Sequence, residues 1–542
     1  MRPIKSIANL LFFFALTNNI FCQTNTILNY LPTDAKTIIK INPASLGQKI
    51  KWDDLMKYKM VEDLLRKTPD QGKEFLDNPS HTGIDFSKGF FVVIPVNKKE
   101  KKLQPVFFAI PKDTAQVAVM VKKLNPEKKI AKLGNGRLMI NNNAAIAWNQ
   151  DIFVLAAYDS TAVTTSDSKA QLSPESKKVK QLTEKCKLLL TKRQTAFNNE
   201  QFLSLLSEQG DMLFWTDNAL QSKPQPNNKA MDALSMMNKG LMRKGNYTSG
   251  VVNFENGKVV ANMKQHLPAS LDSIYRKYPL KNLNTSLVQK LPTGHPLVLC
   301  SFSISPEMLL DNLATSGAGK MLDSMSKQKT KVEDLLPAIK GDLTMAVLKT
   351  DDVAEDDSFT RNMNGLQVFI AGTINDKERF QNLRSLIEGN KQDSTTRSSK
   401  KPKPSILSND SIFVVSLSPI AAQKFLASAS TNAEMEKLIE PYKNHPSAVV
   451  IDLRTVLGLV MQPMTRGKSD EQSKRASEVL GTFDKMVGYG SQHDNSSISS
   501  TLELMLVNKD ENSLKQFLNL IDFIYSTKHK GSTAYNDGVR PN

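Results

Sequence analysis

The chain has 542 residues, of which 40% are hydrophobic and 23% charged, and its formal net charge is +17 at pH 7. This length and composition exclude a disordered chain and predict several globular domains of roughly 100–200 residues each. The basic residues are scattered in short runs such as NKKEKK and SSKKPKPS, which favours solvated loops and helix faces over a nucleic-acid site.

Residues 1–22 are predicted to be a secretory signal peptide. Arg2 and Lys5 precede an apolar run that is too short to span a bilayer, which needs about 20 apolar residues. Cys22 raises the alternative of a lipoprotein, but the bulky Phe21 before it argues against acylation. We therefore predict cleavage after Cys22 and an exported mature chain without a transmembrane span, either periplasmic or associated with the outer membrane.

A segment near the start of the predicted mature chain recurs later in the sequence. YLPTDAKTIIKINPASL (30–46) is echoed by KLPTGHPLVLCSFSISPEMLL (290–310). Each copy contains a turn, an alternating strand and a helix start, with Asn42-Pro43 in the first copy and Ser305-Pro306 in the second. The repeated order indicates an internal duplication.

The parallel continues downstream. Asp113 and Asp376 are each predicted to cap a helix that follows the third strand of its copy. The segments predicted to be equivalent strands are 89–96 and 341–348, 105–113 and 367–376, and 151–158 and 411–418. An extra hairpin is expected at 135–149.

This order, β-α-β-β-α-β, predicts an α+β fold with ferredoxin-like, antiparallel or mixed sheets, each followed by a second α/β subdomain. The predicted units are 23–285, split near 195, and 286–530, split near 430, with a polar tail at 531–542. Asn256-Gly257 marks a hairpin turn in the second half of the first unit.

The opening phrase, followed by NPSHTGIDFSKGFFVVIP, resembles the Gram-negative envelope family catalogued as domain of unknown function 4836. The resemblance covers most of the mature chain and is weaker in the second copy, where Gly294-His295 replaces Asp34-Ala35. It implies a fold and an envelope location, and it implies no activity.

The sequence contains no motif that we assign as a catalytic, cofactor-binding or metal-binding site. The six histidines form no zinc-ligand pattern, and Ser491, His493 and Asp494 are too close in sequence to build a catalytic triad. Gly319-Lys320 lacks the other residues of a phosphate loop. The acidic stretch at 351–357 is interpreted as a solvated loop rather than a calcium site.

The remaining candidates also have structural interpretations. Asp217 and Asp452 end strand-like runs and Asp85 follows HTGI, and all three are expected to cap the next turn or helix. Cys186 and Cys300 are interpreted as separate buried thiols, with a single disulfide left open. Two helical stripes are expected to be core; their residues are Met231, Leu234, Met237 and Leu241, and Leu514, Phe517, Leu518, Ile521 and Tyr525.

The leading hypothesis is a non-enzymatic envelope protein that provides a platform for a protein, a glycan or an anionic lipid surface, with no cofactor. The runner-up is a hydrolase that acts on envelope polymers through a site between the two units. A third possibility is a membrane-peripheral structural protein with one coherent basic face. Lys400, Lys401 and Lys403 are the basic residues expected to meet anionic envelope material.

Overall fold

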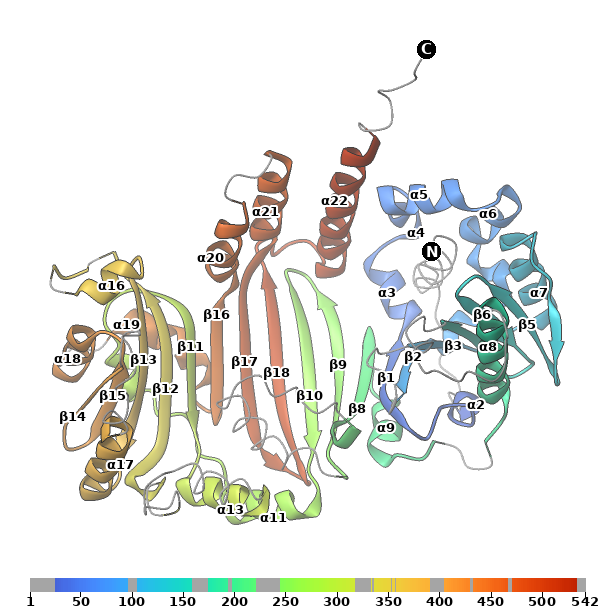
Figure 1. Cartoon of the computed structure of the whole chain (residues 1–542). Helices are drawn as coiled ribbons and strands as arrows, with labels where there is room; N and C mark the ends of the chain where they lie inside the picture. Colours follow the sequence, from blue (N-terminus) through green and yellow to red (C-terminus); the bar gives the residue numbers. More distant parts are fainter. Residues whose placement is uncertain are drawn as a thin grey trace. The chain divides into compact units, whose positions relative to one another are not determined.

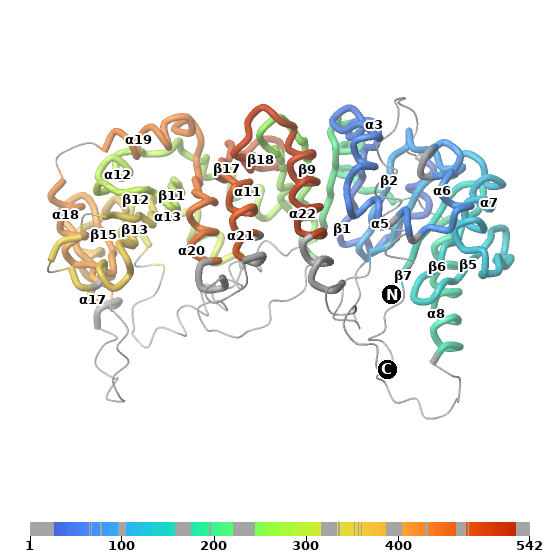
Figure 2. The backbone as a smooth tube through the Cα atoms, turned by 90° about the horizontal axis from the view of Figure 1, so that it is seen from above, coloured from blue at the N-terminus to red at the C-terminus, as the bar shows by residue number. Residues whose placement is uncertain are grey.

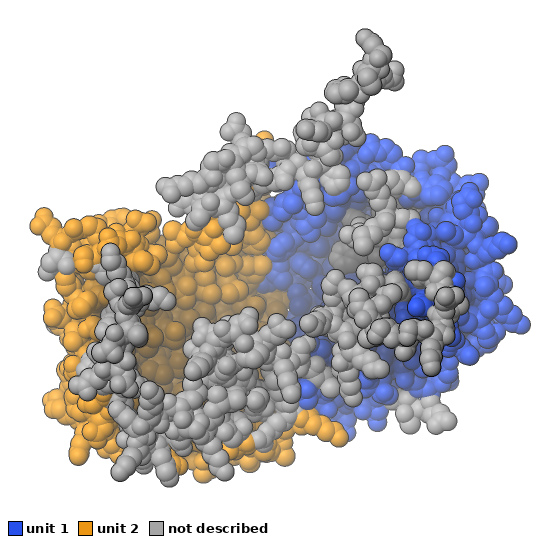
Figure 3. All heavy atoms as spheres, in the orientation of Figure 1, with its two compact units in different colours: residues 1–220, 247–259, 509–542 blue, residues 221–246, 260–508 orange. Residues whose placement is uncertain are grey.

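The structure is a computed structural model, and it describes residues 25–95, 105–157, 174–193, 197–220, 244–316, 333, 336–351, 353–355, 357–389, 404–428, 432–465 and 470–533. The chain divides into two compact units, coloured separately in Figure 3. Unit 1 consists of Met1–Leu220, Tyr247–Val259 and Lys509–Asn542, and unit 2 consists of Gln221–Asn246 and Val260–Asn508. Both contain helices and antiparallel strands, which confirms the predicted α+β class (Figure 1).

Unit 1 has a sheet with helices on both faces. Its strands are β1 Ala35–Ile41, β2 Phe90–Pro95, β3 Val106–Ala109, β4 Ala131–Leu133, β5 Gly136–Asn141, β6 Ala144–Trp148, β7 Phe153–Ala157, β8 Met212–Asp217 and β9 Tyr247–Glu255. Its helices are α2 Asn25–Leu28, α3 Pro43–Lys49, α4 Trp52–Leu55, α5 Lys59–Lys67, α6 Asp70–Asp77, η2 Pro79–Thr82, η3 Phe86–Lys88, α7 Thr114–Leu124, α8 Pro174–Leu190, α9 Glu200–Leu205, η5 Asn218–Leu220 and α22 Ser513–Thr533.

The strand order of unit 1 is β4-β5-β6-β7-β3-β2-β1-β8-β9, and all neighbours are antiparallel. Side chains alternate between the two faces, as a strand dictates. One face packs on α2, α8 and α9 around Trp215, and the other packs on α3 to α7 and α22 around Trp148. The predicted hairpin at 135–149 is present as β5 and β6.

Unit 2 also has one long sheet. Its strands are β10 Lys258–His266 (in unit 2 from Val260), β11 His295–Ser303, β12 Ile339–Lys349, β13 Leu366–Ile374, β14 Ser405–Ser408, β15 Ile412–Ser416, β16 Ser447–Asp452, β17 Phe483–Asp494 and β18 Ser497–Leu506. Its helices are α11 Ala269–Lys277, α12 Ser286–Gln289, α13 Pro306–Ser316, η6 Leu336–Ala338, α16 Ser358–Asn362, α17 Lys377–Gly389, α18 Pro419–Ala427, α19 Ala433–Ile439, η7 Glu440–Tyr442, α20 Leu453–Thr465 and α21 Asp470–Thr482.

The strand order of unit 2 is β14-β15-β13-β12-β11-β16-β17-β18-β10. One face of the sheet packs on α12, α18 and α19 around Phe369 and Phe425. The opposite face carries a small cluster in which α17 packs Phe380 on Phe413, with ring centroids 5.0 Å apart. Figure 2 shows α12 and α19 on one side of these strands and α17 on the other.

The helix starts predicted from the sequence are present. Asn42 accepts a hydrogen bond from the Ser45 amide, and Asp113 accepts from the amides of Ala115 and Gln116. In unit 2, Ser305 Oγ accepts from the Met308 amide and Asp376 Oδ1 accepts from the Arg379 amide. These caps satisfy backbone donors that have no partner within the helix, which is why the two helices in each unit begin at these residues.

The ferredoxin-like detail of the prediction is wrong. In that arrangement the strands on either side of the first helix are parallel and separated by a third strand. Here β1 pairs directly with β2, antiparallel, and Ile41 at the end of β1 lies opposite Phe90 at the start of β2. The helices between them leave and return at the same end of the sheet, so the chain never crosses to a parallel position.

The last helix of the chain packs on unit 1. Leu518 of α22 is buried in the core around Trp148. Tyr58 Oη donates to Asn519 Oδ1 at 2.9 Å, and the Met60 amide donates to Asp522 Oδ1 at 2.8 Å. The stripe predicted from Leu514 to Tyr525 is therefore core in part, since Leu518 is buried and Ile521 is exposed.

Across the described part of the chain, no helix combines the length and the apolar character needed to cross a bilayer.

Candidate functional site

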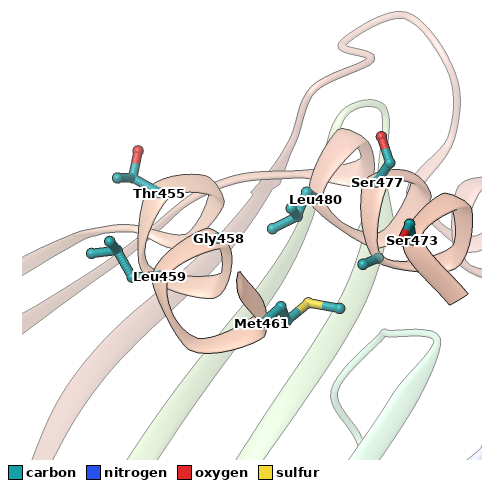
Figure 4. Close-up of a pocket in the computed structure, with 8 residues that line it drawn as sticks. Thr455, Gly458, Leu459, Met461, Ser473, Ser477 and Leu480 are labelled. Atoms are coloured by element: carbon teal, nitrogen blue, oxygen red, sulfur yellow. The ribbon is translucent and has the colours of Figure 1, made fainter. Parts of the chain in front are cut away.

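A groove lies between the helices α20 and α21 of unit 2. The two helices run side by side (Figures 1 and 2). Its volume is about 420 Å³, within the range of about 300–1,000 Å³ that is usual for small-molecule sites. Met461 from α20 and Leu480 from α21 point into the space between the helices (Figure 4). The lining residues are Thr455, Gly458, Leu459, Met461, Ser473, Ala476, Ser477 and Leu480.

The groove exists because small side chains face each other across the helix pair. Gly458 lies on α20, and Ser473, Ala476 and Ser477 follow one face of α21 at helical spacing. A Cβ placed on Gly458 would meet no other heavy atom within 4 Å. Side chains of this size cannot fill the space that the helix spacing leaves.

A polar network holds the first turn of α20, at one end of the groove. Asp452 caps the helix, accepting from the Thr455 amide at 2.9 Å and from the Thr455 hydroxyl at 2.7 Å, and His295 Nε2 lies 2.5 Å from Asp452 Oδ2. Burial alone would raise the pKa of Asp452, but the Thr455 amide and the His295 ring together hold it below its ordinary value. The carboxylate therefore stays charged and fixes one lining residue.

A second polar cluster lies at the tip of the β17–β18 hairpin. Asn495 and Ser496 both have positive φ, 44° and 62°, at the two central positions of the turn. Nearby, Asp272 Oδ1 lies 2.8 Å from His493 Nε2, and Arg276 Nε donates to Asp272 Oδ2 at 2.9 Å. Burial would raise the pKa of Asp272, but its bonds to Arg276, Ser496 and His493 lower it.

The sheet of unit 2 also has an open apolar face. One register row crosses five strand pairings on this face, which we call the unit 2 row: Val449, Cys300, Met345, Ile370, Val415 and Ile406. Met345 is 42% exposed and Ile370 is 37% exposed, although both lie on interior strands. Large apolar side chains in the middle of a sheet are normally covered, so their exposure identifies a surface that another molecule can cover.

The residues singled out from the sequence are not brought together. Ser491 Oγ donates to the carbonyls of Gln492 and Ser499, and His493 is paired with Asp272 rather than Asp494. Asp85 caps η3, Asp217 accepts from the Ala219 amide, and Asp452 caps α20, as expected.

Two predictions need correction or further detail. Asp357 in the acidic stretch is buried rather than solvated; it accepts from Ser418 Oγ at 2.6 Å and from the Thr360 hydroxyl at 2.7 Å. Burial would raise the pKa of Asp357, but these two hydroxyls lower it. Cys186 and Cys300 are free thiols, the first buried and the second half-buried, which answers the open question of a disulfide.

Other predictions fall outside the described residues: the signal peptide with Cys22, Gly319-Lys320, the stripe from Met231 to Leu241, and Lys400, Lys401 and Lys403. Among the residues that the structure does describe, no group of three or more His, Cys, Asp or Glu side chains could hold a metal ion.

Sequence reasoning missed the groove, although two signals were available. LRTVLGLVMQPM in α20 is apolar on nearly every face, and Val460 is 54% exposed. A helix that is apolar all round needs cover on all sides. The small residues Ser473, Ala476 and Ser477 recur at i, i+3 and i+4 on the next helix.

Comparison with known proteins gave a family and distantly similar solved structures. A family model described as "Domain of unknown function (DUF4836)" matches residues 27–399, so the groove lies outside the matched region. The search of curated proteins gave no match. A solved structure described as "Structure of crystal form I of TP0453" matches with a TM-score of 0.24 and 8% identity, covering 45% of this chain and 78% of the other.

Proposed function

The chain belongs to the DUF4836 family, and we propose that it is an exported envelope protein that acts as a non-enzymatic binding or structural platform. The observation that carries the proposal is the open apolar face of unit 2, with Met345 and Ile370 exposed in the middle of a sheet. A broad, partly apolar sheet surface suits contact with another macromolecule or a lipid surface better than it suits chemistry on a small substrate.

We propose that the two units arose by tandem duplication, with the predicted boundaries 23–285 and 286–530. The support is the strand order: β6-β7-β3-β2-β1-β8-β9 within unit 1 has the same succession as β14-β15-β13-β12-β11-β16-β17 within unit 2. The compact units are defined by contacts between residues, whereas the proposed repeats are defined by similarity of sequence, so their boundaries differ. This is why α22 belongs to unit 1 by contact while it ends the second repeat.

Export is proposed from the sequence alone, with cleavage after Cys22. Mass spectrometry of the purified mature chain checks this: the expected N-terminus is Gln23. A diacylglycerol-modified Cys22 at the N-terminus would instead make the protein a lipoprotein and would place it at a membrane surface.

The hydrolase remains the second candidate, because a paired histidine and aspartate, His493 and Asp272, lie at the strained turn of the β17–β18 hairpin. Strained backbone and a His–Asp pair occur together in hydrolase sites. Tyr275 stacks on the His493 ring at 5.9 Å, and the ring and Asp272 are mostly buried, which suits a structural pair better than a proton shuttle.

The test of the platform is sedimentation of the purified mature chain with isolated envelope membranes. Replacing Met345 and Ile370 by serine should reduce the bound fraction several-fold, since these side chains form the exposed middle of the unit 2 row. Val119 and Leu188, which are also exposed but lie on α7 and α8 of unit 1, provide the control, and their serine variants should bind as the native chain does.

Equal sedimentation of both double variants would contradict the platform. Turnover of peptidoglycan, glycan or ester substrates that disappears in a folded His493→Ala protein would favour the hydrolase.

A further inference from the structure

We propose that the groove between α20 and α21 binds a single aliphatic chain with an anionic head group, that is, a fatty acid or a similar single-chain amphiphile. The inference rests on the proposed binding function and gives that function a ligand class. It concerns a site separate from the unit 2 row, so the two can be tested independently.

The lining sets the chemistry of the ligand. The eight lining residues include no charged side chain, and Leu459, Met461, Ala476 and Leu480 present carbon and sulfur to the groove. The Thr455 hydroxyl is already donated to Asp452. A polar ligand would lose its hydrogen bonds to water on entering such a site, whereas a hydrocarbon chain would lose none.

The shape favours a chain over a ring system. The lining runs from Thr455 to Met461 on α20 and from Ser473 to Leu480 on α21, which is about 10 Å along each helix at the usual rise. A site that is two helical turns long and bordered by a helix on each side is a slot, and an extended hydrocarbon chain fits a slot along its whole length.

The charges at the ends of the groove favour an anionic head group. Arg454 lies one turn before Gly458 on α20, and Lys474 follows Ser473 on α21; both side chains are exposed. Arg454 therefore lies near the Thr455 end of the slot and Lys474 near the Ser473 end, with Glu478 one turn after Lys474 on α21.

A partner helix is a poorer occupant. A helix with its side chains is about 10–12 Å wide and needs apolar neighbours on both sides of its seat. The α20 side offers Leu459 and Val460, but the α21 side carries the exposed charges of Lys474 and Glu478.

Titration calorimetry on the full mature chain tests the proposal, with octanoate, decanoate and dodecanoate as probes below their micellar concentrations and decyl maltoside as the uncharged probe. Affinity should rise about fourfold per added methylene until the slot is full. Decanoate should bind more tightly than decyl maltoside at low salt, and the difference should shrink as salt is added.

Gly458→Leu should abolish binding of all four probes, because the new side chain occupies the open space beside Gly458. Gly481→Leu is the matched control: this glycine lies on the neighbouring helix α21, a Cβ there would also meet nothing within 4 Å, and it does not line the groove. Both variants should melt at or above the native temperature, since leucine favours a helix more than glycine does.

The double variant Arg454→Ser and Lys474→Ser should weaken decanoate binding roughly two- to fivefold for the pair at low salt and leave decyl maltoside unchanged. Undiminished decanoate binding in folded Gly458→Leu would overturn the assignment of the site. Loss of decyl maltoside binding equal to that of decanoate in the double variant would overturn the anionic head group.

The failures of the two proposals are distinguishable. If the native chain binds none of the alkyl probes but sediments with envelope membranes, the aliphatic ligand is wrong and the platform stands. If it binds them as expected while the serine variants of Met345 and Ile370 sediment like the native chain, the ligand stands and the platform is wrong.

Discussion

The two units differ in how far helices cover the same row of side chains in their sheets. The unit 1 row, defined by the same succession of strands as the unit 2 row, consists of Phe214, Ile39, Val92, Phe107, Leu155 and Ile146. Val92 and Phe107, which correspond to Met345 and Ile370, are partly buried and pack against the core around Trp148, and Leu155 and Ile146 are buried in that core. In unit 2 the corresponding middle, Met345 and Ile370, is open.

The difference shows that the order of the strands does not determine which helices pack on the face of the sheet. Unit 1 gains its cover from the four α-helices between β1 and β2 and from α22, which comes from the far end of the sequence. Unit 2 has α17 over one end of its row. The covered face is expected to contribute stability and the open face to remain available for contact, and four measurements test this difference.

The largest effect is expected at Asp211, which anchors the cover of unit 1. This fully buried carboxylate accepts from Ser45 Oγ and the Phe254 amide, both at 2.5 Å, and pairs with Lys49 of α3. Asp211→Ala leaves buried donors without their acceptor and should lower the free energy of unfolding of unit 1 by about 3–5 kcal/mol.

Native-state hydrogen exchange measures this for each unit separately. Asp410→Ala in unit 2, which removes an exposed partner of Lys377, is the control and should change little. Equal protection losses in both units would show that α3 is not fixed through Asp211.

The rows themselves can be compared directly with one substitution in each. Leu155→Ala in the covered row should cost roughly 2–5 kcal/mol, because it removes a buried side chain and leaves a cavity. Ile370→Ala in the open row should cost less than about 1 kcal/mol. Urea unfolding of the two variants gives both values; similar losses would mean that the unit 2 row is covered in solution.

A pH dependence should appear at the contact between α5 and α22. Burial, and then the nearby carboxylates of Glu511 and Asp522, raise the pKa of Tyr58 to about 12 from its ordinary 10.0. The folded state therefore keeps a proton that the unfolded state releases. This contribution is complete below pH 10 and is lost as pH rises towards about 12.

Melting curves between pH 8 and pH 12 measure that loss. The loss attributable to Tyr58 is the difference between the native chain and Tyr58→Phe, which should be less stable at pH 8 but have a flatter pH profile. Identical profiles would show that the hydroxyl is not held against α22.

The smallest effect concerns reactivity and leaves stability unchanged. Burial raises the pKa of the Cys186 thiol to about 12 in the core of unit 1, and it also raises that of Cys300, which is only half-buried in the unit 2 row. A maleimide at pH 8 should label Cys300 well before Cys186 in the folded chain. Intact-mass analysis of Cys300→Ser and Cys186→Ser proteins assigns the label, and faster labelling of Cys186 would contradict an open row.

Local structure could be predicted from the sequence because caps and alternation are local. Asn42-Pro43, Asp113, Ser305-Pro306 and Asp376 each start the helix expected of them. The strand pairings could not be predicted in the same way. Whether β1 and β2 become direct neighbours depends on the end of the sheet to which the intervening helices return the chain, and no short motif encodes that.

The candidate site was less accessible to sequence reasoning. His493 finds its partner Asp272 across 221 residues rather than in the adjacent Asp494, and His295 finds Asp452 across 157. The groove depends on the spacing of two helices, which small residues permit but do not specify. The apolar character of α20 and the small residues on one face of α21 were the two signals of the groove in the sequence.

The docking of α22 also determines when the protein can finish folding. Tyr58 and Asn519 are separated by 461 residues, and Met60 and Asp522 by 462, so the contacts that complete unit 1 close one of the longest loops the chain allows. A growing chain has every residue of unit 2, which ends at Asn508, before it has α22. Domains usually mature in the order in which the ribosome makes them. Here the unit that is begun first is completed last, and its apolar face around Trp148 stays unsealed until the final helix has been synthesised.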